Sequence, residues 1–147
     1  MRPSSTRYLS MKKNDSKKQI SEAINACLEK KAEELTVLEL EKNTGAFTDY
    51  FVICSGTNPR QIQAISDEVE LRLKRAGTFP HSIEGFKQAE WILLDYVDFV
   101  VHVFSEAARR YYDLERLWRS AKKIEPAELV RKPRTRAAKT TAEKKRA

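Results

Sequence analysis

The stretch WILLDYVDFVVHVF, residues 91–104, contains two short apolar runs on either side of the acidic sequence DYVD, residues 95–98. Both runs are rich in β-branched and aromatic residues, which favour strands, and the few residues between them permit a tight antiparallel hairpin. Alternation along a strand would send Asp95 and Asp98 to opposite faces, so a metal ion shared by these carboxylates would require the turn to intervene. The stretch therefore predicts a hairpin with an acidic turn.

The sequence after this hairpin predicts a helix. Ser105 is a suitable N-cap, and Glu106 lies in the first turn, where a carboxylate favours the helix dipole. Asp113 could instead cap a separate last turn. The expected apolar stripe consists of Tyr111, Leu114, Leu117 and Trp118.

A second helix is predicted from the segment GTNPRQ, residues 56–61. Asn58 can act as its cap, Pro59 suits the first helical position, and Gln61 can complete a capping box. Gly77 would end this helix. Its expected buried face consists of Ile62, Ile65, Val69 and Leu73.

The remaining predicted elements complete a mixed sheet. Residues 36–40 and 50–55 predict strands, and residues 80–86 could supply a short third one. A first helix is expected to start at Ser16 as its N-cap. Its core-facing stripe would be Ile20, Ala23, Ile24, Cys27, Leu28 and Lys31. Together the elements predict an α/β fold, with a mixed β-sheet flanked by α-helices.

Charge is distributed unevenly along the 147 residues, whose formal net charge is +7. Residues 1–18 and 131–147 together hold fourteen of the 28 basic residues and two of the 21 acidic ones, which leaves 14 basic and 19 acidic residues in between. The middle of the chain is therefore acidic and suited to a basic partner surface. We expect disordered basic tails over residues 1–18 and 126–147, and a single folded domain over residues 19–125.

Composition predicts a soluble protein that is not exported. No apolar run approaches the roughly 20 residues of a membrane-spanning helix, and Cys27 and Cys54 fit apolar patterns typical of buried free thiols. We expect a cytoplasmic location. The Arg- and Ser-rich first stretch weakly resembles an organellar transit peptide, and Met11 could be the true start, so an organellar location is the alternative.

Several catalytic readings can be weighed on the residues alone. The GTNPR segment could hold a phosphate at a helix start, and Asp49, Asp95 and Asp98 could bind a metal ion in a nucleotidyl-transfer site. Helix capping explains the first segment equally well, and no Walker or GxGxxG loop is present. His102 in its strand is typical of a packing or interface residue, and Cys54 of a core thiol. We predict no enzyme activity, no cofactor and no metal site.

Aromatic and charged residues near the hairpin and the last helix favour a binding protein instead. Trp, Tyr and Arg are the residue types that most often anchor protein interfaces. Trp91 and Tyr96 flank the acidic turn and are expected to be exposed, whereas Tyr111 and Trp118 are expected in the core. The basic tails could contact ribosomal RNA non-specifically or simply be solvated.

The motifs resemble those of one known family. The ordered set consists of DYFVICSGTNPRQIQAISDEVE (49–70), EG (84–85), WILLDYVDFVVHVF (91–104) and RRYYDLERLW (109–118). In this order and over roughly residues 20–120, they closely resemble the ribosomal silencing factor family, also called Iojap. The resemblance implies a nucleotidyltransferase-like α/β fold without the catalytic residues of that superfamily.

The resemblance also implies a function. Members of the family bind the fourteenth protein of the large ribosomal subunit and block joining of the small subunit, which represses translation when nutrients are scarce. Organelle relatives act in assembly of the large subunit. At the level of motifs, it implies a partner-binding face formed by Trp91, Asp95, Tyr96, Asp98, His102, Tyr111, Tyr112, Leu114 and Glu115. A homodimer is compatible with the sequence.

One position departs from the family pattern. Many members have glycine where this chain has Val97 between the tyrosine and the second aspartate. Valine tolerates a positive φ poorly, so we expect a turn type that does not depend on glycine. Two alternatives remain open: an RNA-binding assembly factor for the large subunit that acts through its basic tails, and a nucleotidyltransferase.

Overall fold

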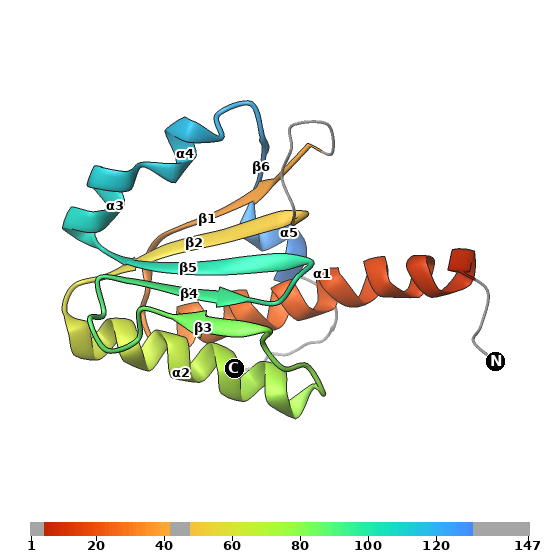
Figure 1. Cartoon of the computed structure of the whole chain (residues 1–147), viewed down its shortest axis with the longest axis horizontal. Coiled ribbons are helices and arrows are strands. Elements are labelled where there is room, and N and C mark those ends of the chain that lie inside the picture. Colours follow the sequence, from red (N-terminus) through yellow and green to blue (C-terminus); the bar gives the residue numbers. More distant parts are fainter. Residues whose placement is uncertain (1–4, 42–47, 131–147) are drawn as a thin grey trace, which may run out of the picture.

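A six-stranded mixed sheet forms the centre of the computed structural model, which describes residues 5–41 and 48–130, with side chains described from Ser16 onward (Figure 1). The strand order is β3-β4-β5-β2-β1-β6, in which β2 and β5 are parallel and the other neighbours antiparallel. The strands are β1 (Glu33–Glu39), β2 (Tyr50–Gly56), β3 (Ser82–Glu84), β4 (Trp91–Asp95), β5 (Phe99–Ser105) and β6 (Lys122–Ile124). The helices are α1 (Ser5–Glu29), α2 (Pro59–Arg75), α3 (Glu106–Tyr112), α4 (Leu114–Leu117) and α5 (Pro126–Val130).

The predicted α/β fold and its hairpin are confirmed. β4 and β5 pair in antiparallel register, with Trp91 opposite Phe104 and Leu93 opposite His102. Because successive side chains point to opposite faces, these four side chains lie on one face of the sheet. β2 then continues the sheet on the other side of β5.

Helices cover both faces of the sheet, and Figure 1 shows α1 and α2 on one side with α3 and α4 on the other. The α1–α2 side holds the larger core, to which α5 adds Leu129 and Val130. The α3–α4 side holds a smaller core formed by Leu38, Leu40, Ile53, Phe104, Ala108 and Leu114. The central strands are therefore buried on both faces, which explains their nearly continuous apolar sequences.

Helix α2 begins as the sequence predicts. Asn58 is its N-cap and accepts a hydrogen bond from the Gln61 backbone N–H at 2.8 Å, with Pro59 at the first helical position. The Gln61 side-chain oxygen accepts from the Thr57 backbone N–H at 2.7 Å. These contacts occupy backbone groups that a phosphate at this turn would need, which favours capping over phosphate binding.

Two expectations about the ends of the chain are corrected. Helix α1 starts at Ser5 and not at Ser16, so the expected disordered tail over residues 1–18 is wrong for residues 5–18. Ser16 is instead a buried residue inside the helix. At the other end, residues 126–130 form α5, whereas the rest of the expected tail, residues 131–147, lies outside the described residues, as do residues 1–4.

The predicted stripe of α1 is confirmed except at its end. Leu28 is 51% exposed, and Lys31 lies beyond the helix with a positive φ of 63°. The helix ends at Glu29, so neither residue continues the buried stripe. The other predicted positions are fully buried: Ile20, Ala23, Ile24 and Cys27.

Candidate partner-binding face

Aromatic side chains gather where α3 and α4 cross the sheet. We call this surface the aromatic face; it comprises Phe51, Trp91, Phe104, Tyr111, Tyr112, Leu117 and Trp118. The Trp91 ring lies 4.5 Å from that of Tyr112 and 5.0 Å from that of Phe104, measured between ring centroids. Elsewhere on the aromatic face, the rings of Phe51 and Trp118 meet edge to face, with 5.9 Å between their centroids.

Part of the aromatic face is open to solvent. Tyr111 is 81% exposed, Leu117 70% and Tyr112 48%. Tyr111 meets Tyr112 edge to face, with 5.0 Å between ring centroids, and Leu117 directly precedes Trp118 in sequence. Large exposed side chains beside a packed aromatic cluster are typical of a protein-binding surface. The expectation that Tyr111 belongs to the core is therefore wrong, while Trp118 is half-buried.

The break between α3 and α4 explains the exposure of Tyr111. Asp113 adopts a left-handed conformation, with φ 46° and ψ 58°, and so interrupts the helix that the apolar stripe predicts to be continuous. After this break, Leu114 turns into the small core at 9% exposure, whereas Tyr111 and Leu117 face solvent. The alternative that Asp113 precedes a separate last turn is the correct one.

An ion pair between the buried Arg109 and the partly exposed Glu115 fixes α3 and α4 against the sheet. The Arg109 guanidinium donates two hydrogen bonds to the Glu115 carboxylate, at 3.2 and 2.7 Å, and others to the hydroxyls of Ser55 and Thr36. The hydrogen bond from Arg109 lowers the pKa of Glu115. Glu115, predicted to contact a partner, is thus engaged within the protein, and Arg109 is the positioning residue that sequence reasoning missed.

His102 lies beneath the aromatic face and holds Trp91. The Trp91 indole N–H donates to Nδ1 of His102 at 3.0 Å, so the neutral imidazole carries its proton on Nε2. His102 is 3% exposed, and burial lowers its pKa to about 3. A histidine that stays neutral and covered is suited to orienting Trp91 and not to proton transfer with a substrate.

The Nε2 atom of His102 has no hydrogen-bond partner among the residues that the structure describes. The Phe51 ring stands edge to face with the imidazole, 4.6 Å between centroids. A buried N–H without a hydrogen-bonding partner costs free energy. Its hydrogen bond to Trp91 through the other ring nitrogen partly offsets that cost.

The acidic turn does not form a pair of metal-binding carboxylates. The Asp95 carboxylate accepts a hydrogen bond from the Val97 backbone N–H at 2.8 Å and so supports the turn. The Asp98 carboxylate accepts a hydrogen bond from the Ser16 hydroxyl of α1 at 3.5 Å, so Asp98 lies toward the α1–α2 side of the sheet, opposite the aromatic face. Among the described residues, no group of three His, Cys, Asp or Glu side chains could hold a metal ion.

Tyr96 is buried, contrary to our expectation. It is 6% exposed, stacks on Phe99 at 5.0 Å and belongs to the core on the α1–α2 side. The alternation from Ile92 and Leu94 already points to that side. Of the predicted site residues, the structure gathers Trp91, His102, Tyr111, Tyr112, Leu114 and Glu115, whereas Tyr96 and Asp98 lie apart, and Asp95 lies at the far end of β4 from Trp91.

The turn at Val97 also differs from our expectation. Val97 has φ 73°, in the region that valine disfavours, and the Asp98 N–H donates to the Tyr96 carbonyl at 2.8 Å across it. This is a strained γ-turn. The Thr48 hydroxyl donates to the Val97 carbonyl at 2.8 Å, so hydrogen bonds on both sides hold a conformation that the side chain opposes.

The prediction missed two aromatic residues of this face, Phe51 and Phe104. Phe104 lies on the same face as His102 by alternation along β5, and Phe51 reaches that face from its position in β2. A strand buried on both faces hides this signal, because apolar residues then occupy every position. The two thiols, in contrast, match the prediction: Cys27 and Cys54 are buried, with their sulfurs 3.8 Å apart.

No helix in the described ranges, residues 5–41 and 48–130, is long and apolar enough to cross a bilayer.

Comparison with known proteins connects this geometry to a family. The model described as "Ribosomal silencing factor during starvation" matches residues 13–147. The ribosomal silencing factor of Halalkalibacterium halodurans is 41% identical over 103 residues, which are 70% of this chain and 87% of that protein. A mouse protein named "Mitochondrial assembly of ribosomal large subunit protein 1" is 35% identical over 75 residues, 49% of this chain and 33% of that protein.

A solved structure shares the fold. The crystal structure of a Chromobacterium violaceum protein has a TM-score of 0.66 and 33% identity, and the match covers 74% of this chain and 88% of that one. Since the family model spans nearly the whole chain and a named member shares 41% of its residues over most of its length, the sequence similarity is extensive. The chain belongs to the ribosomal silencing factor family, also called Iojap.

Proposed function

We propose that this protein binds the large ribosomal subunit through its fourteenth protein and sterically blocks joining of the small subunit, which represses translation when nutrients are scarce. Its family consists of ribosome-associated regulatory factors. The observation that carries the proposal is the aromatic face, where Tyr111 and Leu117 are 81% and 70% exposed beside a fixed Trp91. Such a surface suits a protein partner.

The residues of the aromatic face and those that support it have different roles in this proposal. Tyr111, Tyr112 and Leu117 would contact the partner directly, together with the accessible part of Trp91. His102 orients Trp91, while Glu115 and Leu114 hold the α3–α4 segment against the sheet. Pre-ordered side chains lose little conformational entropy when a partner binds, which favours affinity.

Charge near the aromatic face is mixed. Segment 106–119 contains the acidic residues Glu106, Asp113 and Glu115 and the basic residues Arg109, Arg110, Arg116 and Arg119. The acidic balance of the folded domain therefore comes from other parts of the surface, including the turn with Asp95 and Asp98. We propose that the negative net charge of residues 19–130 steers the domain toward a basic ribosomal protein, and that the aromatic contacts supply most of the affinity.

Blockade requires no chemical step, so we propose that the protein is not an enzyme. The two groups best suited to acid–base or nucleophilic chemistry, His102 and Cys54, are both buried. We further propose that it acts in the cytoplasm, as bacterial members of the family would. An organellar location and a homodimer remain predictions.

A role in assembly of the large subunit is the second candidate. It is favoured by the similarity to the mouse protein, whose name refers to mitochondrial large-subunit assembly. In that case, depletion should lower the amount of mature large subunits during growth. A silencing factor should instead change the fraction of joined subunits in nutrient-starved cells, with mature large subunits unchanged.

The direct test is sedimentation of purified ribosomal subunits with the protein. Wild type should travel with the large subunit and reduce the joined fraction. The double variant Tyr111→Ala, Leu117→Ser alters exposed residues, so it should fold normally yet lose about 2 kcal/mol or more of binding free energy, roughly 30-fold in affinity.

A matched control is Phe79→Ala, which removes another exposed aromatic side chain, 65% exposed, away from the aromatic face. It should leave subunit binding unchanged. The variants Trp91→Ala and Asp95→Lys, made singly, can then separate the contributions of the two ends of β4. If wild type leaves subunit joining intact, or travels with the small subunit, the proposed function is wrong.

A further inference from the structure

The two cysteines of the chain meet inside the larger core. Cys27 and Cys54 are the only cysteines in the sequence, and residues 28–53 separate them along the chain. Their sulfur atoms lie 3.8 Å apart, and both side chains are 0% exposed. A disulfide bond is about 2.05 Å long, so the two sulfurs need to move less than about 2 Å closer to form one.

The two thiols belong to different parts of the fold. Cys27 lies in the last turn of α1, which ends at Glu29. Cys54 lies in the middle of β2, opposite Val103 of the parallel strand β5. A bond between the two sulfurs would therefore fasten the end of a helix to the centre of the sheet.

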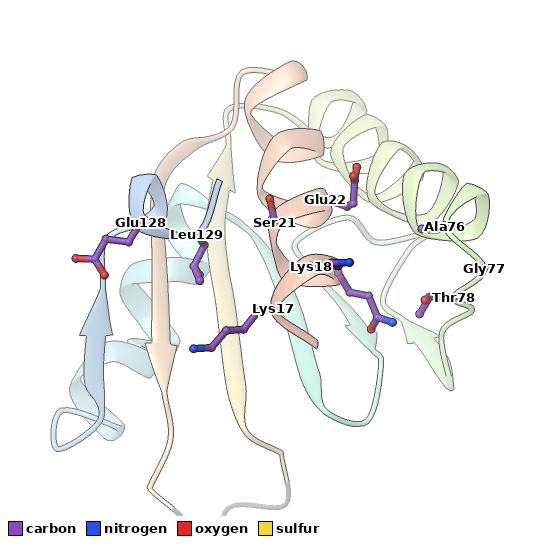
Figure 2. Close-up of a pocket in the computed structure, with 10 residues that line it drawn as sticks. Lys17, Lys18, Ser21, Glu22, Ala76, Gly77, Thr78, Glu128 and Leu129 are labelled. Carbon is purple, nitrogen blue, oxygen red and sulfur yellow. The ribbon is translucent and has the colours of Figure 1, made fainter. Parts of the chain in front are cut away.

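Helix α1 has an open flank in the turns before Cys27. A groove of about 750 Å³ lies between α1, the end of α2 and α5. Figure 2 shows Ser21 and Glu22 on the α1 side of this groove, Gly77 just beyond α2, and Leu129 on α5. An element with an open flank has fewer packing contacts, so its local opening costs less free energy. α1 is thus an element that a covalent bond to the sheet would restrain.

Polar contacts at the surface hold the end of α1 to α2. The Gln61 side-chain amide donates hydrogen bonds to the carbonyls of Lys30 and Lys31, both at 3.0 Å. Arg72 and Glu29 also form an ion pair at 3.5 Å, but the Glu29 side chain is 58% exposed, so the pair contributes little. When these contacts break, the last turn of α1 can open and bring its thiol to solvent.

While α1 is closed, the thiols are protected from oxidation. The hydrogen bond with Cys54 and burial both raise the pKa of Cys27. Thiols attack oxidants as thiolates, so a raised pKa slows the reaction. Oxidation therefore depends on how often the end of α1 opens.

We propose that Cys27 and Cys54 form a reversible disulfide when a peroxide oxidises the protein, and that this bond locks α1 onto the sheet. First, one thiolate attacks an oxygen of hydrogen peroxide, and the O–O bond breaks to give a sulfenic acid and hydroxide. The second thiolate then attacks the sulfenic sulfur, so that the S–S bond forms, the S–O bond breaks and another hydroxide leaves. The two thiol protons convert the hydroxides to water, and the dithiol loses the two electrons that peroxide gains.

The disulfide does not depend on which partner binds the aromatic face. Both thiols belong to the core on the α1–α2 side of the sheet, whereas the aromatic face lies over the smaller core on the other side. Disulfides in a reducing compartment are usually transient and redox-sensing. A bond that forms under peroxide and is later reduced fits that pattern.

The test exposes the reduced full-length protein to hydrogen peroxide and then titrates free thiols in denaturant. Wild type should lose both thiols, gain no dimer band on a non-reducing gel, and yield a peptide pair joined between Cys27 and Cys54 in mass spectrometry. Its thermal midpoint should rise by about 10 °C, because the bond constrains the unfolded chain, and should return after dithiothreitol. Cys27→Ala and Cys54→Ala should show neither the cross-link nor the rise.

A matched pair of variants tests whether the end of α1 controls the reaction. Gln61→Glu keeps the side-chain oxygen that accepts from Thr57 but loses the amide that donates to the two carbonyls at the end of α1. It should speed the loss of free thiols by about 3- to 10-fold. The control Gln63→Glu loses the donor to the Phe86 carbonyl and should react at the wild-type rate.

Distinct results would overturn the proposal. It is wrong if both thiols survive peroxide in wild type and in Gln61→Glu, if the disulfide forms between chains, or if either sulfur is oxidised to a sulfinic acid without a cross-link. Equal rates for the two glutamine variants would contradict control by the end of α1. None of these measurements involves ribosomal subunits, so a failure of the proposed function would leave them unchanged.

Discussion

Gly85 lies against the backbone of Trp91, and we predict that Gly85→Ala is strongly destabilising. Gly85 has φ 80°, and a Cβ added there would lie 2.1 Å from the Trp91 carbonyl oxygen and 3.2 Å from its carbonyl carbon. Gly77 provides the matched comparison: its φ is 87°, but an added Cβ would meet no atom within 4 Å. Gly77→Ala therefore tests the cost of the positive φ alone, whereas Gly85→Ala tests that cost together with the close contact to the Trp91 backbone.

The two costs can be worked out separately. A left-handed conformation costs alanine about 1–2 kcal/mol, and the reduced entropy of the unfolded chain offsets about 0.5–1 kcal/mol of this. Gly77→Ala should then lower the free energy of unfolding by roughly 0.5–1 kcal/mol. Gly85→Ala must in addition move the Trp91 backbone, which adds about 1–3 kcal/mol as overpacking does.

Urea unfolding followed by circular dichroism measures the stability of both variants, and tryptophan fluorescence reports the environments of Trp91 and Trp118. Gly85→Ala should also weaken binding to the large subunit, because displacement of Trp91 disturbs the aromatic face, whereas Gly77→Ala should not. Equal destabilisation of the two variants would show that the close approach at Trp91 does not matter. Unchanged subunit binding by folded Gly85→Ala would refute the link between this turn and the aromatic face.

Three further predictions concern titration and strain. Burial lowers the pKa of His102 to about 3, so the free energy of unfolding should fall as pH drops below the ordinary pKa near 6.5, by up to about 1.4 kcal/mol per pH unit. In urea titrations between pH 7 and 5, His102→Phe should remove this dependence on pH. The control His81→Phe, at an exposed position, should retain it. The pKa of Glu115 is lowered in the folded protein, so its pair with Arg109 stabilises the fold at pH above the ordinary pKa of 4.5, and this stability is lost as pH falls through the lower folded pKa. Acid unfolding of Glu115→Gln should therefore depend less on pH in that range. An unchanged acid-unfolding profile would contradict the role of the pair. Val97→Gly should relieve the strained turn at φ 73°, so it should be about 1 kcal/mol more stable than Val97→Ala and unfold at a thermal midpoint a few degrees higher. A lower midpoint for Val97→Gly than for Val97→Ala would contradict strain at this position.

The hairpin and helix α2 could be predicted because each is specified by neighbouring residues. Alternation defines β4 and β5, and Asn58 with Pro59 and Gln61 defines where α2 begins. Local signals of this kind do not depend on the rest of the fold. Alternation for the two strands and capping for the helix were therefore enough to predict these elements.

The ends of the chain and the exposure of two tyrosines depend on tertiary structure. The first turns of α1 have no continuous apolar stripe, so periodicity could not identify them. Tyr111 fits the stripe of one continuous helix, but the left-handed Asp113 interrupts that helix and leaves Tyr111 in solvent. Tyr96 lies beside acidic residues, which favours a surface position, but alternation from Leu94 directs its side chain inward.

The parallel pairing of β2 with β5 constrains the order in which the chain can fold. β2 ends at Gly56 and β5 begins at Phe99, so the two central strands cannot join until α2, β3 and β4 have been made. During synthesis, the nascent chain must therefore keep the apolar faces of α1, β1 and β2 without their final partners. Pairing of strands far apart in sequence is slow and leaves such surfaces open to aggregation. A protein that acts on ribosomes must thus be nearly complete before its own core can close.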